Sequence, residues 1–316
     1  MIAAHADWSI DPAKRFTTIG RKASGLWVLD IPRLTGDVAA LLPRLARAAA
    51  GEAVVLGIDC PIGLPRAYAA QLSGLSSFPA FLKGLHPDSA FFQVAREIDE
   101  VSLARPFYPA GTVSGMGHKM ALAQKLGLAE PSDMSRLVDL ATASRPAAGQ
   151  LFWTLGPNQC GKAALAAWRD LLLPAFAFLP IRLWPFDGPL LALAKPGIIT
   201  VAETYPAEAM RHLGVKLFGG KRDQAARRAS AGQIFDAMDR LHVKRPIELT
   251  LAVGNGFGAA PNADDAFDSL IGALGIINVL NGHRPDAPPG PVDMWEGWVL
   301  GQTDLPNLAG GRDALF

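Results

Sequence analysis

The sequence predicts a mixed α/β fold: a five-stranded mixed sheet flanked by helices, with a largely helical insertion after the fourth strand. Segments of strand character alternate with segments whose apolar residues recur at helical spacing, in the order strand, strand, strand, helix, strand, insertion, helix, strand, helices. A mixed sheet covered by helices satisfies such an order. With 50% hydrophobic residues in a chain of 316, a sizeable core can be buried.

The first three predicted strands follow one another closely and form an antiparallel meander. Their sequences are "MIAAHADWS", "RFTTIGRKASG" and "LWVLDIPRL". The first helix is predicted over "TGDVAALLPRLARAAAGE", with Thr35 or Asp37 as its N-cap and Gly51 near its end. The fourth strand, "AVVLGID", is continuously apolar, which is typical of a strand buried on both faces.

Residues 66–150 are irregular and rich in Pro, Gly and Ser, with short helical patterns such as "PAFLKGL" and "GHKMALAQKLGL". We therefore expect a single domain over 1–316, with 66–150 as an insertion or lid within it. The remaining elements follow the insertion in this order: a helix "GKAALAAWRDLLLPAF", the segment "IRLWPFDG", a strand "GIITVAETYP", a basic helical stretch over 219–243, a glycine-rich loop "GNGFGAAPNA" and a helix "DDAFDSLIGALGIINVL".

Composition excludes several classes of protein. The formal net charge is +1 at a sequence pI of about 7.8, so nucleic acid would have to be bound by a local basic patch. The most apolar stretch, "LLLPAFAFLPIRLW", contains Pro174 and Pro180 and is too short to span a bilayer. Asp7 interrupts the N-terminal apolar run and basic residues follow it, the reverse of a signal peptide. With only Cys60 and Cys160 as thiols, the sequence predicts a cytoplasmic protein without a membrane partner.

Acidic residues stand at the ends of predicted strands and on one face of the last helix. Asp7 lies in the first strand, Asp59 ends the fourth, and Glu203 lies near the end of the fifth. Ligands gather at the carboxyl ends of strands in α/β sheets. Asp265 and Asp268 are three residues apart and share a helix face.

Each of these acids alone is explained equally well as a helix cap or a strand-end polar residue. Together they would repel one another and raise one another's pKa unless a cation neutralised them. Oxygen ligands without His or Cys suit Mg²⁺ or Mn²⁺.

Five motifs in this chain are similar to those of predicted RNase H-like nucleases, grouped as domain of unknown function 429. They are "GIDCPIGLP", "ETYPAE", "GGKRDQAARR", "DDAFDSLIGAL" and "EGWVLGQ", and they span most of the sequence. The resemblance implies an RNase H-like sheet of five strands, the first three antiparallel, with carboxylates grouped at its catalytic edge. It also implies that Asp7 and Asp59 are metal ligands from the first and fourth strands, that Asp265 and Asp268 are the acidic pair of the last helix, and that Glu203 belongs to the family's own motif.

The activity implied by the resemblance is metal-dependent hydrolysis of phosphodiesters in nucleic acid, with these five acids as catalytic residues and as ligands of Mg²⁺ or Mn²⁺. In place of the Glu that RNase H carries on its first helix, this chain offers only Asp37 and Glu52 there. Cleavage of RNA–DNA hybrids is therefore not implied. The choice between DNA and RNA, and the oligomeric state, stay open.

Basic residues are concentrated between Arg211 and Arg245, and Lys221, Arg222 and Arg228 are the candidates for binding substrate phosphates. The alternative for this stretch is a solvated helix face. Tyr205 and Trp8 lie beside candidate ligands in the sequence and are either base-stacking residues or part of the core.

Two other functions stay open at this stage. An actin-like phosphotransferase or ATPase uses the same kind of sheet but needs two such domains and glycine-rich phosphate loops. A non-catalytic RNase H-like binding protein would keep the fold without the chemistry. Two glycine-rich motifs do not support nucleotide binding, because "GPNQCGKA" has Ala163 where a P-loop has Ser or Thr, and "GNGFGA" has Ala259 where a dinucleotide fingerprint has Gly.

Overall fold

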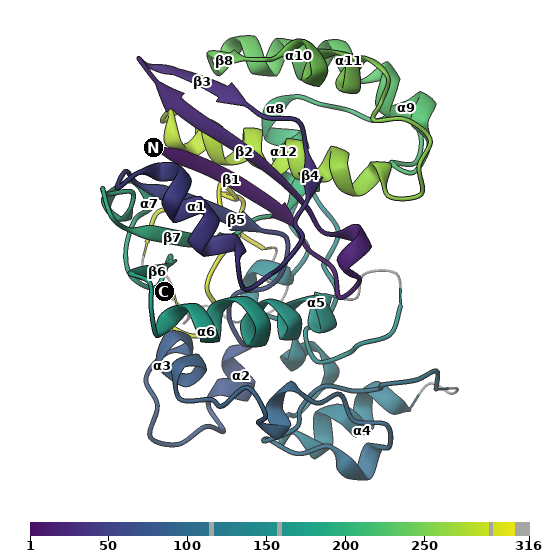
Figure 1. Cartoon of the computed structure of the whole chain (residues 1–316). Helices are drawn as coiled ribbons and strands as arrows, with labels where there is room; N and C mark the ends of the chain where they lie inside the picture. The colour runs from purple at the N-terminus through teal and green to yellow at the C-terminus, as the bar shows by residue number, and fades with distance from the viewer. Residues whose placement is uncertain (114–116, 157–159, 291–292, 307–316) are drawn as a thin grey trace. The chain divides into compact units, whose positions relative to one another are not determined.

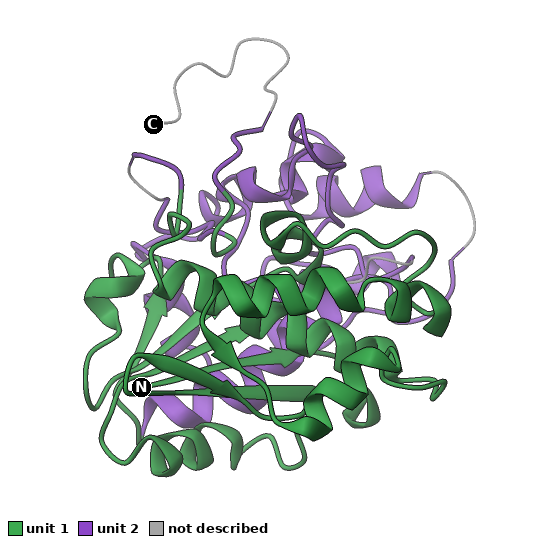
Figure 2. Cartoon of the chain, turned by 90° about the horizontal axis from the view of Figure 1, so that it is seen from above, with its two compact units in different colours: residues 1–59, 178–287, 299–302 green, residues 60–177, 288–298, 303–316 purple. Residues whose placement is uncertain are grey.

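The computed structural model describes residues 1–113, 117–156, 160–290 and 293–306, which fall into two compact units (Figures 1 and 2). The first unit contains residues 1–59, 178–287 and 299–302. The second contains residues 60–177 and 288–298 and the described residues from 303 onward. The segment expected to be an insertion, 66–150, belongs to the second unit, which extends beyond it on both sides.

An eight-stranded mixed sheet forms the first unit, in the order β6-β7-β5-β1-β2-β3-β8 with β4 paired to β2. The strands are β1 (Ile2–Asp7), β2 (Phe16–Ala23), β3 (Leu26–Leu29), β4 (Arg33–Leu34), β5 (Val54–Ile58), β6 (Ile181–Trp184), β7 (Ile199–Glu203) and β8 (Val243–Lys244). Strand β2 is antiparallel to β1, β3 and β4, whereas β1, β5, β7 and β6 are successive parallel neighbours. The expected mixed sheet and antiparallel meander are confirmed.

The expected number of five strands is wrong, since the sheet has eight. The third predicted strand is divided into β3 and β4, because the segment between them contains Pro32, which has no N–H for a ladder. Strand β8 has two residues, too few to show an alternating pattern in the sequence. Strand β6 lies in "IRLWPFDG", a segment to which the sequence pattern assigned no strand.

The first helix begins later than its pattern predicts. Helix α1 spans Leu41–Ala49, and Ala40 is its N-cap without a side-chain hydrogen bond. The expected capping by Thr35 or Asp37 is therefore wrong. The Thr35 hydroxyl instead lies 2.8 Å from the Thr17 hydroxyl, and Asp37 Oδ1 accepts a hydrogen bond from the N–H of Ala39 at 3.0 Å. These side chains order the segment that leads into the helix.

The remaining helices of the first unit are α7 (Leu190–Leu193), α8 (Pro206–Leu213), α9 (Gln224–Ala229), α10 (Ala231–Arg240), α11 (Ile247–Gly254) and α12 (Ala263–Leu280). The basic stretch predicted as helical over 219–243 is therefore a loop, two helices and strand β8. Helix α12 is buried along most of its length and packs against β1, β2 and α8. Figure 1 shows it running behind β1 and β2.

The second unit is built from short helices and turns around an aromatic core. Its helices are α2 (Arg66–Ala69), α3 (Phe78–Lys83), α4 (His118–Lys125), α5 (Cys160–Ala166) and α6 (Leu173–Phe176). The turn between α5 and α6 is π-helical, next to Pro174, which has no N–H to donate. Buried rings of Phe91, Phe107, Phe152 and Trp168 contact one another in the core.

None of the helices in the described ranges is both long enough and apolar enough to cross a membrane.

Candidate functional site

Three neighbouring parallel strands of the first unit end at one edge of the sheet, and an acidic residue stands at each end. Asp7 is the last residue of β1, Glu203 is the last residue of β7, and Asp59 directly follows β5. The ladder continues past β5, because the N–H of Asp59 donates to the carbonyl oxygen of Ala6 at 3.1 Å. Ala6 is paired with Ile58, so Asp7 and Asp59 are the next pair and their side chains lie on the same face.

Glu203 shares this edge of the sheet but not this face. It is paired with Ile58, the residue before Asp59. Successive residues of a strand point to opposite faces, so the Glu203 side chain lies on the face opposite to Asp7 and Asp59. Its carboxylate is buried and still contributes to the raised pKa of Asp59, although less than burial or Asp268 does. The structure therefore separates Glu203 from the other candidate ligands.

Helix α12 brings its acidic residues to the face that carries Asp7. The helix lies close to β1 at Gly272, where an added Cβ would lie 2.2 Å from the His5 ring. His5 and Asp7 are two residues apart on one strand face, a distance of about 6.6 Å. Gly272 and Asp268 are four residues apart on the helix, a rise of about 6 Å. An added Cβ at Gly20, which is paired with Ala3, would lie 3.3 Å from Ile277, so α12 runs opposite to β1. The contact between Gly272 and His5 therefore places Asp268 opposite Asp7.

Strand β5 approaches α12 in the same way. Gly57 shares the face of Asp59, and an added Cβ at this glycine would lie 2.6 Å from Cδ1 of Ile276 on α12. Asp59 is thus also on the side of the sheet that α12 covers. A glycine at each contact, Gly272 on the helix and Gly57 on β5, lets the helix lie close to the sheet, and this closeness brings acids from distant parts of the sequence together.

Burial and mutual repulsion perturb these carboxylates strongly. Burial raises the pKa of Asp7 well above its ordinary value, and the carboxylates of Asp268, Asp59 and Asp265 raise it further while Lys221 lowers it. The pKa of Asp59 is raised to about 7, first by burial and then by Asp268, with Lys221 opposing. Asp268 raises the pKa of both Asp7 and Asp59, and Asp59 and Asp265 raise that of Asp7, so these four predicted acids lie near one another.

The first turns of α12 carry a third acid that the sequence pattern did not single out. Asp264 is 8% exposed, and after burial it is the main cause that raises the pKa of Asp265 to about 6. Burial also raises the pKa of Asp268, against the attraction of Lys221. Oδ2 of Asp265 is buried without a hydrogen-bond partner among the described residues. The cluster therefore contains an acceptor oxygen with no donor.

Lys221 is the counter-ion of this cluster. Its Nζ donates a hydrogen bond to Oδ2 of Asp268, whose side chain is 4% exposed, whereas the Lys221 side chain is 52% exposed. Burial lowers the pKa of Lys221, but the attraction of Asp268, the hydrogen bond, and the charges of Asp59 and Asp7 more than offset this and leave the pKa raised. Lys221 therefore remains protonated beside the acids.

The donor chemistry of the cluster fits a hard divalent cation, since its ligating atoms are carboxylate oxygens and one buried oxygen has no donor. In the ranges that the structure describes, no three His, Cys, Asp or Glu side chains are close enough to hold a metal ion as they stand. The ammonium of Lys221 supplies the positive charge in this arrangement. Coordination of an ion would require the acidic side chains to turn toward it.

A scan against protein-family models, a search of curated proteins and a search of solved structures each found no match to this chain. The similarity to RNase H-like nucleases stays an expectation. The function of the cluster must follow from its own residues and their neighbours.

A buried arginine fastens the loop that carries Lys221. Arg227 is 1% exposed, and its guanidinium donates to the carbonyl oxygens of Lys221, Gly256 and Gly258, the last two at 2.8 Å each. It therefore joins the loop before α9 to the loop that precedes α12. The sequence could not distinguish Arg227 from the surrounding basic residues, because its role depends on burial.

The other basic candidates divide into two groups. Arg222 is 90% exposed, and its Nε lies 3.8 Å from Oδ2 of Asp264, so it stands with Lys221 beside the acids. Arg228 is exposed on α9. Several other basic residues of this stretch bond to the unit itself: Arg211 to Glu208, Arg240 to the Leu213 carbonyl at 2.7 Å, and Arg245 to Asp239 at 2.5 Å. These three residues and Arg227 therefore have structural roles.

The two aromatic candidates differ in exposure. Trp8 is buried, and the Arg15 guanidinium carbon lies 4.8 Å from the centre of its ring, which supports its interpretation as a core residue. Tyr205 is 41% exposed. The motif "GPNQCGKA" lies partly outside the described residues.

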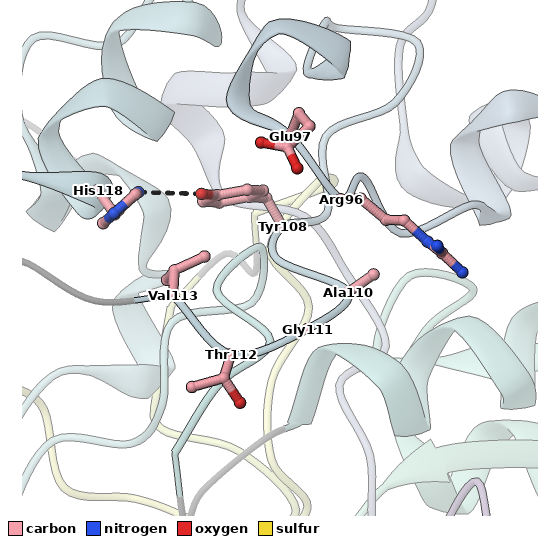
Figure 3. A pocket seen from close by; sticks show the side chains of 8 residues that line it. All are labelled: Arg96, Glu97, Tyr108, Ala110, Gly111, Thr112, Val113 and His118. Atoms are coloured by element: carbon pink, nitrogen blue, oxygen red, sulfur yellow. Dashed lines mark hydrogen bonds between the residues drawn. The ribbon is translucent and has the colours of Figure 1, made fainter.

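A cavity of about 580 Å³ lies within the second unit (Figure 3). Its lining residues are Arg96, Glu97, Tyr108, Ala110, Gly111, Thr112, Val113 and His118. The Tyr108 hydroxyl and Nδ1 of His118 are 2.9 Å apart. One carboxylate, that of Glu97, lines this cavity, so it lacks the grouped acids that distinguish the edge of the sheet.

Proposed function

We propose that this protein is a divalent-metal-dependent phosphodiesterase that acts on nucleic acid, with its site at the carboxyl edge of an RNase H-like sheet. The observation that carries the proposal is the meeting of Asp7, Asp59 and Asp268 on one face of the sheet, where Asp268 raises the pKa of both other acids and Asp59 raises that of Asp7. Buried like charges destabilise a fold unless a ligand neutralises them. Oxygen donors without His or Cys select Mg²⁺ or Mn²⁺ as that ligand.

Asp7, Asp59, Asp265 and Asp268 would hold the ion, and Asp264 would support the last two from the same helix turn. A divalent ion at this place supplies Lewis-acid polarisation of a phosphoryl oxygen and a lowered pKa for bound water. Glu203 is left out of this set because it lies on the other face of the sheet.

Two cations next to the acids support a phosphate-bearing substrate. Lys221 and Arg222 lie on the loop that Arg227 fastens, and both side chains are at least half exposed. A phosphodiester drawn to them would lie beside the carboxylates, and its negative charge would be compensated by a loop whose position is fixed before binding. The net charge of +1 means that this local pair, and not an overall field, would attract the substrate.

The proposal is tested with Asp7→Asn and with Asp30→Asn as a matched control. Asp30 is a surface residue of the same unit that pairs with Arg21 at 2.5 Å. Purified proteins are incubated with Mn²⁺ and with single-stranded and duplex DNA and RNA. We expect cleavage by the wild type and the control, and none by Asp7→Asn. Equal cleavage by Asp7→Asn refutes the proposed site, and ATP hydrolysis without nuclease activity favours a phosphotransferase.

A further inference from the structure

A second cavity, of about 350 Å³, lies in the first unit next to the acidic cluster. One of its walls is Phe16, which is paired with Asp7 across strands β1 and β2. Another is formed by Ala263 and Ala266 on the first turns of α12, on a different side of the helix from Asp265 and Asp268. Through the pairing of Phe16 with Asp7, a ligand in this cavity would be bound beside the carboxylate of Asp7.

The lining of this cavity is mainly apolar, with amides at its polar positions. Phe16, Ile31, Pro32 and Phe257 provide flat or aliphatic surfaces, and Asn255 provides an amide. Asn262 provides a second amide, whose Nδ2 donates to the Ala13 carbonyl at 2.9 Å. Aromatic faces with a few amides are suited to an uncharged, flat, polar-edged molecule.

Phe257 is held in a conformation that its side chain disfavours. Its φ is 61°, in the left-handed region that a bulky residue rarely adopts. The carbonyl oxygens on both sides of it, those of Gly256 and Gly258, accept hydrogen bonds from the buried Arg227. The ring also contacts Phe267 edge to face, with centroids 6.2 Å apart. Backbone strain that the surroundings maintain in this way is concentrated at ligand sites.

We propose that this cavity receives a nucleobase of the substrate, which we call the base cavity. This inference rests on the proposed function and specifies its substrate. An uncharged base is accepted next to the acids, whereas a phosphate in the same cavity would be repelled by them. The loop of Phe257 is joined through Arg227 to the loop of Lys221 and Arg222, and these two cations would take the phosphodiester of a base bound in the cavity. A base paired within a duplex cannot enter, so the substrate class is single-stranded nucleic acid or an extruded nucleotide.

The experiment uses Phe257→Gly, because glycine adopts a φ of 61° without strain and the change removes only the ring. The matched control is Phe178→Gly, at a residue of the same unit that is 85% exposed. Binding is measured by fluorescence anisotropy in Ca²⁺, with a labelled single strand and with the blunt duplex of the same sequence. Urea denaturation establishes that both variants fold.

We expect Phe257→Gly to bind the single strand about tenfold more weakly, the loss typical of one stacked base, and to bind the duplex unchanged. A strand of the same length made of abasic nucleotides separates base recognition from charge. The wild type should bind it about tenfold more weakly than the normal strand, and Phe257→Gly should bind the two alike.

Unchanged binding of the single strand by Phe257→Gly would refute the proposal that this cavity receives a nucleobase. Equal affinity of the wild type for normal and abasic strands would refute it as well. These readouts do not depend on cleavage. Failure of the proposed function appears separately, as Mn²⁺-dependent cleavage that survives Asp7→Asn.

Discussion

The carboxylate cluster destabilises the fold when no ligand neutralises it, so removing one acid should stabilise the protein. Asp59 is the clearest case, because its pKa is raised to about 7 by burial and by the neighbouring Asp268. Asp59→Asn removes the buried charge and keeps the size and polarity of the side chain. We therefore expect this variant to resist urea better than the wild type at pH 8 in EDTA.

The magnitude follows from the shift in the pKa of Asp59. A rise from 3.8 to about 7 is about 3 units. At 1.36 kcal/mol per unit this is a cost of about 4 kcal/mol once the group is ionised. Because the variant also deprives Lys221 of one acidic partner, we expect a net gain of about 2 kcal/mol in the free energy of unfolding.

The same shift fixes the direction of the pH dependence. An acid whose pKa is higher in the folded state costs nothing below its unfolded value of 3.8, and its full cost is present above its folded value. The wild type should therefore lose stability as the pH rises from about 4 to about 7, and Asp265, with a pKa of about 6, contributes to the same slope. Asp59→Asn should show a shallower slope and match the wild type near pH 4.

The assay is urea denaturation of both proteins from pH 4 to pH 8 in EDTA, repeated with Mn²⁺ at pH 8. Asp88→Asn is the control, because the Asp88 side chain is 92% exposed. Mn²⁺ should stabilise the wild type more than Asp59→Asn, since a ligand that binds only the folded protein raises its stability. If Asp59→Asn is less stable than the wild type at pH 8 in EDTA, the cluster is not under the repulsion inferred here.

Two other predictions concern the counter-ion and the helix contact. Lys221→Met should bind Mn²⁺ about tenfold more tightly than the wild type at pH 8, because the Lys221 ammonium no longer competes with the ion for the carboxylates. Calorimetric titration measures the affinity, and weaker binding by the variant contradicts the prediction. Gly272→Ala should lower the free energy of unfolding by about 1–3 kcal/mol, because the added Cβ would lie 2.2 Å from the His5 ring. Urea denaturation should show no such loss for Gly232→Ala, where an added Cβ meets nothing within 4 Å on α10.

The positions of Asp7 and Asp59 could be predicted from the sequence because each stands at the end of an apolar run of strand length. A strand buried on both faces is continuously apolar, so the first charged residue after it indicates where the strand ends at the edge of the sheet. Asp265 and Asp268 could be predicted as a pair because helical spacing alone places them on one face.

The side of the sheet on which Glu203 lies could not be predicted in this way. A shift of one residue in the pairing of β7 with β5 moves every side chain of the strand to the other face, and register depends on the whole sheet. The structural role of Arg227 could not be predicted either, because the sequence does not distinguish a buried arginine from an exposed one. The strain at Phe257 arises from hydrogen bonds made by a residue 30 positions earlier in the chain.

A single residue, Arg227, connects the acidic cluster to the base cavity. Arg227 fixes the loop of Lys221 and, through the carbonyls of Gly256 and Gly258, the backbone of Phe257. One buried guanidinium thus bonds to the backbone of the loop of Lys221, which we propose binds phosphate, and to the backbone on both sides of Phe257, a wall of the proposed base cavity. Groups that must act on adjacent parts of one nucleotide need such a fixed separation, because a loop free to move would lose binding energy to ordering. We therefore expect that loss of the Arg227 hydrogen bonds would weaken the binding of phosphate and of base together, because the same guanidinium holds both loops.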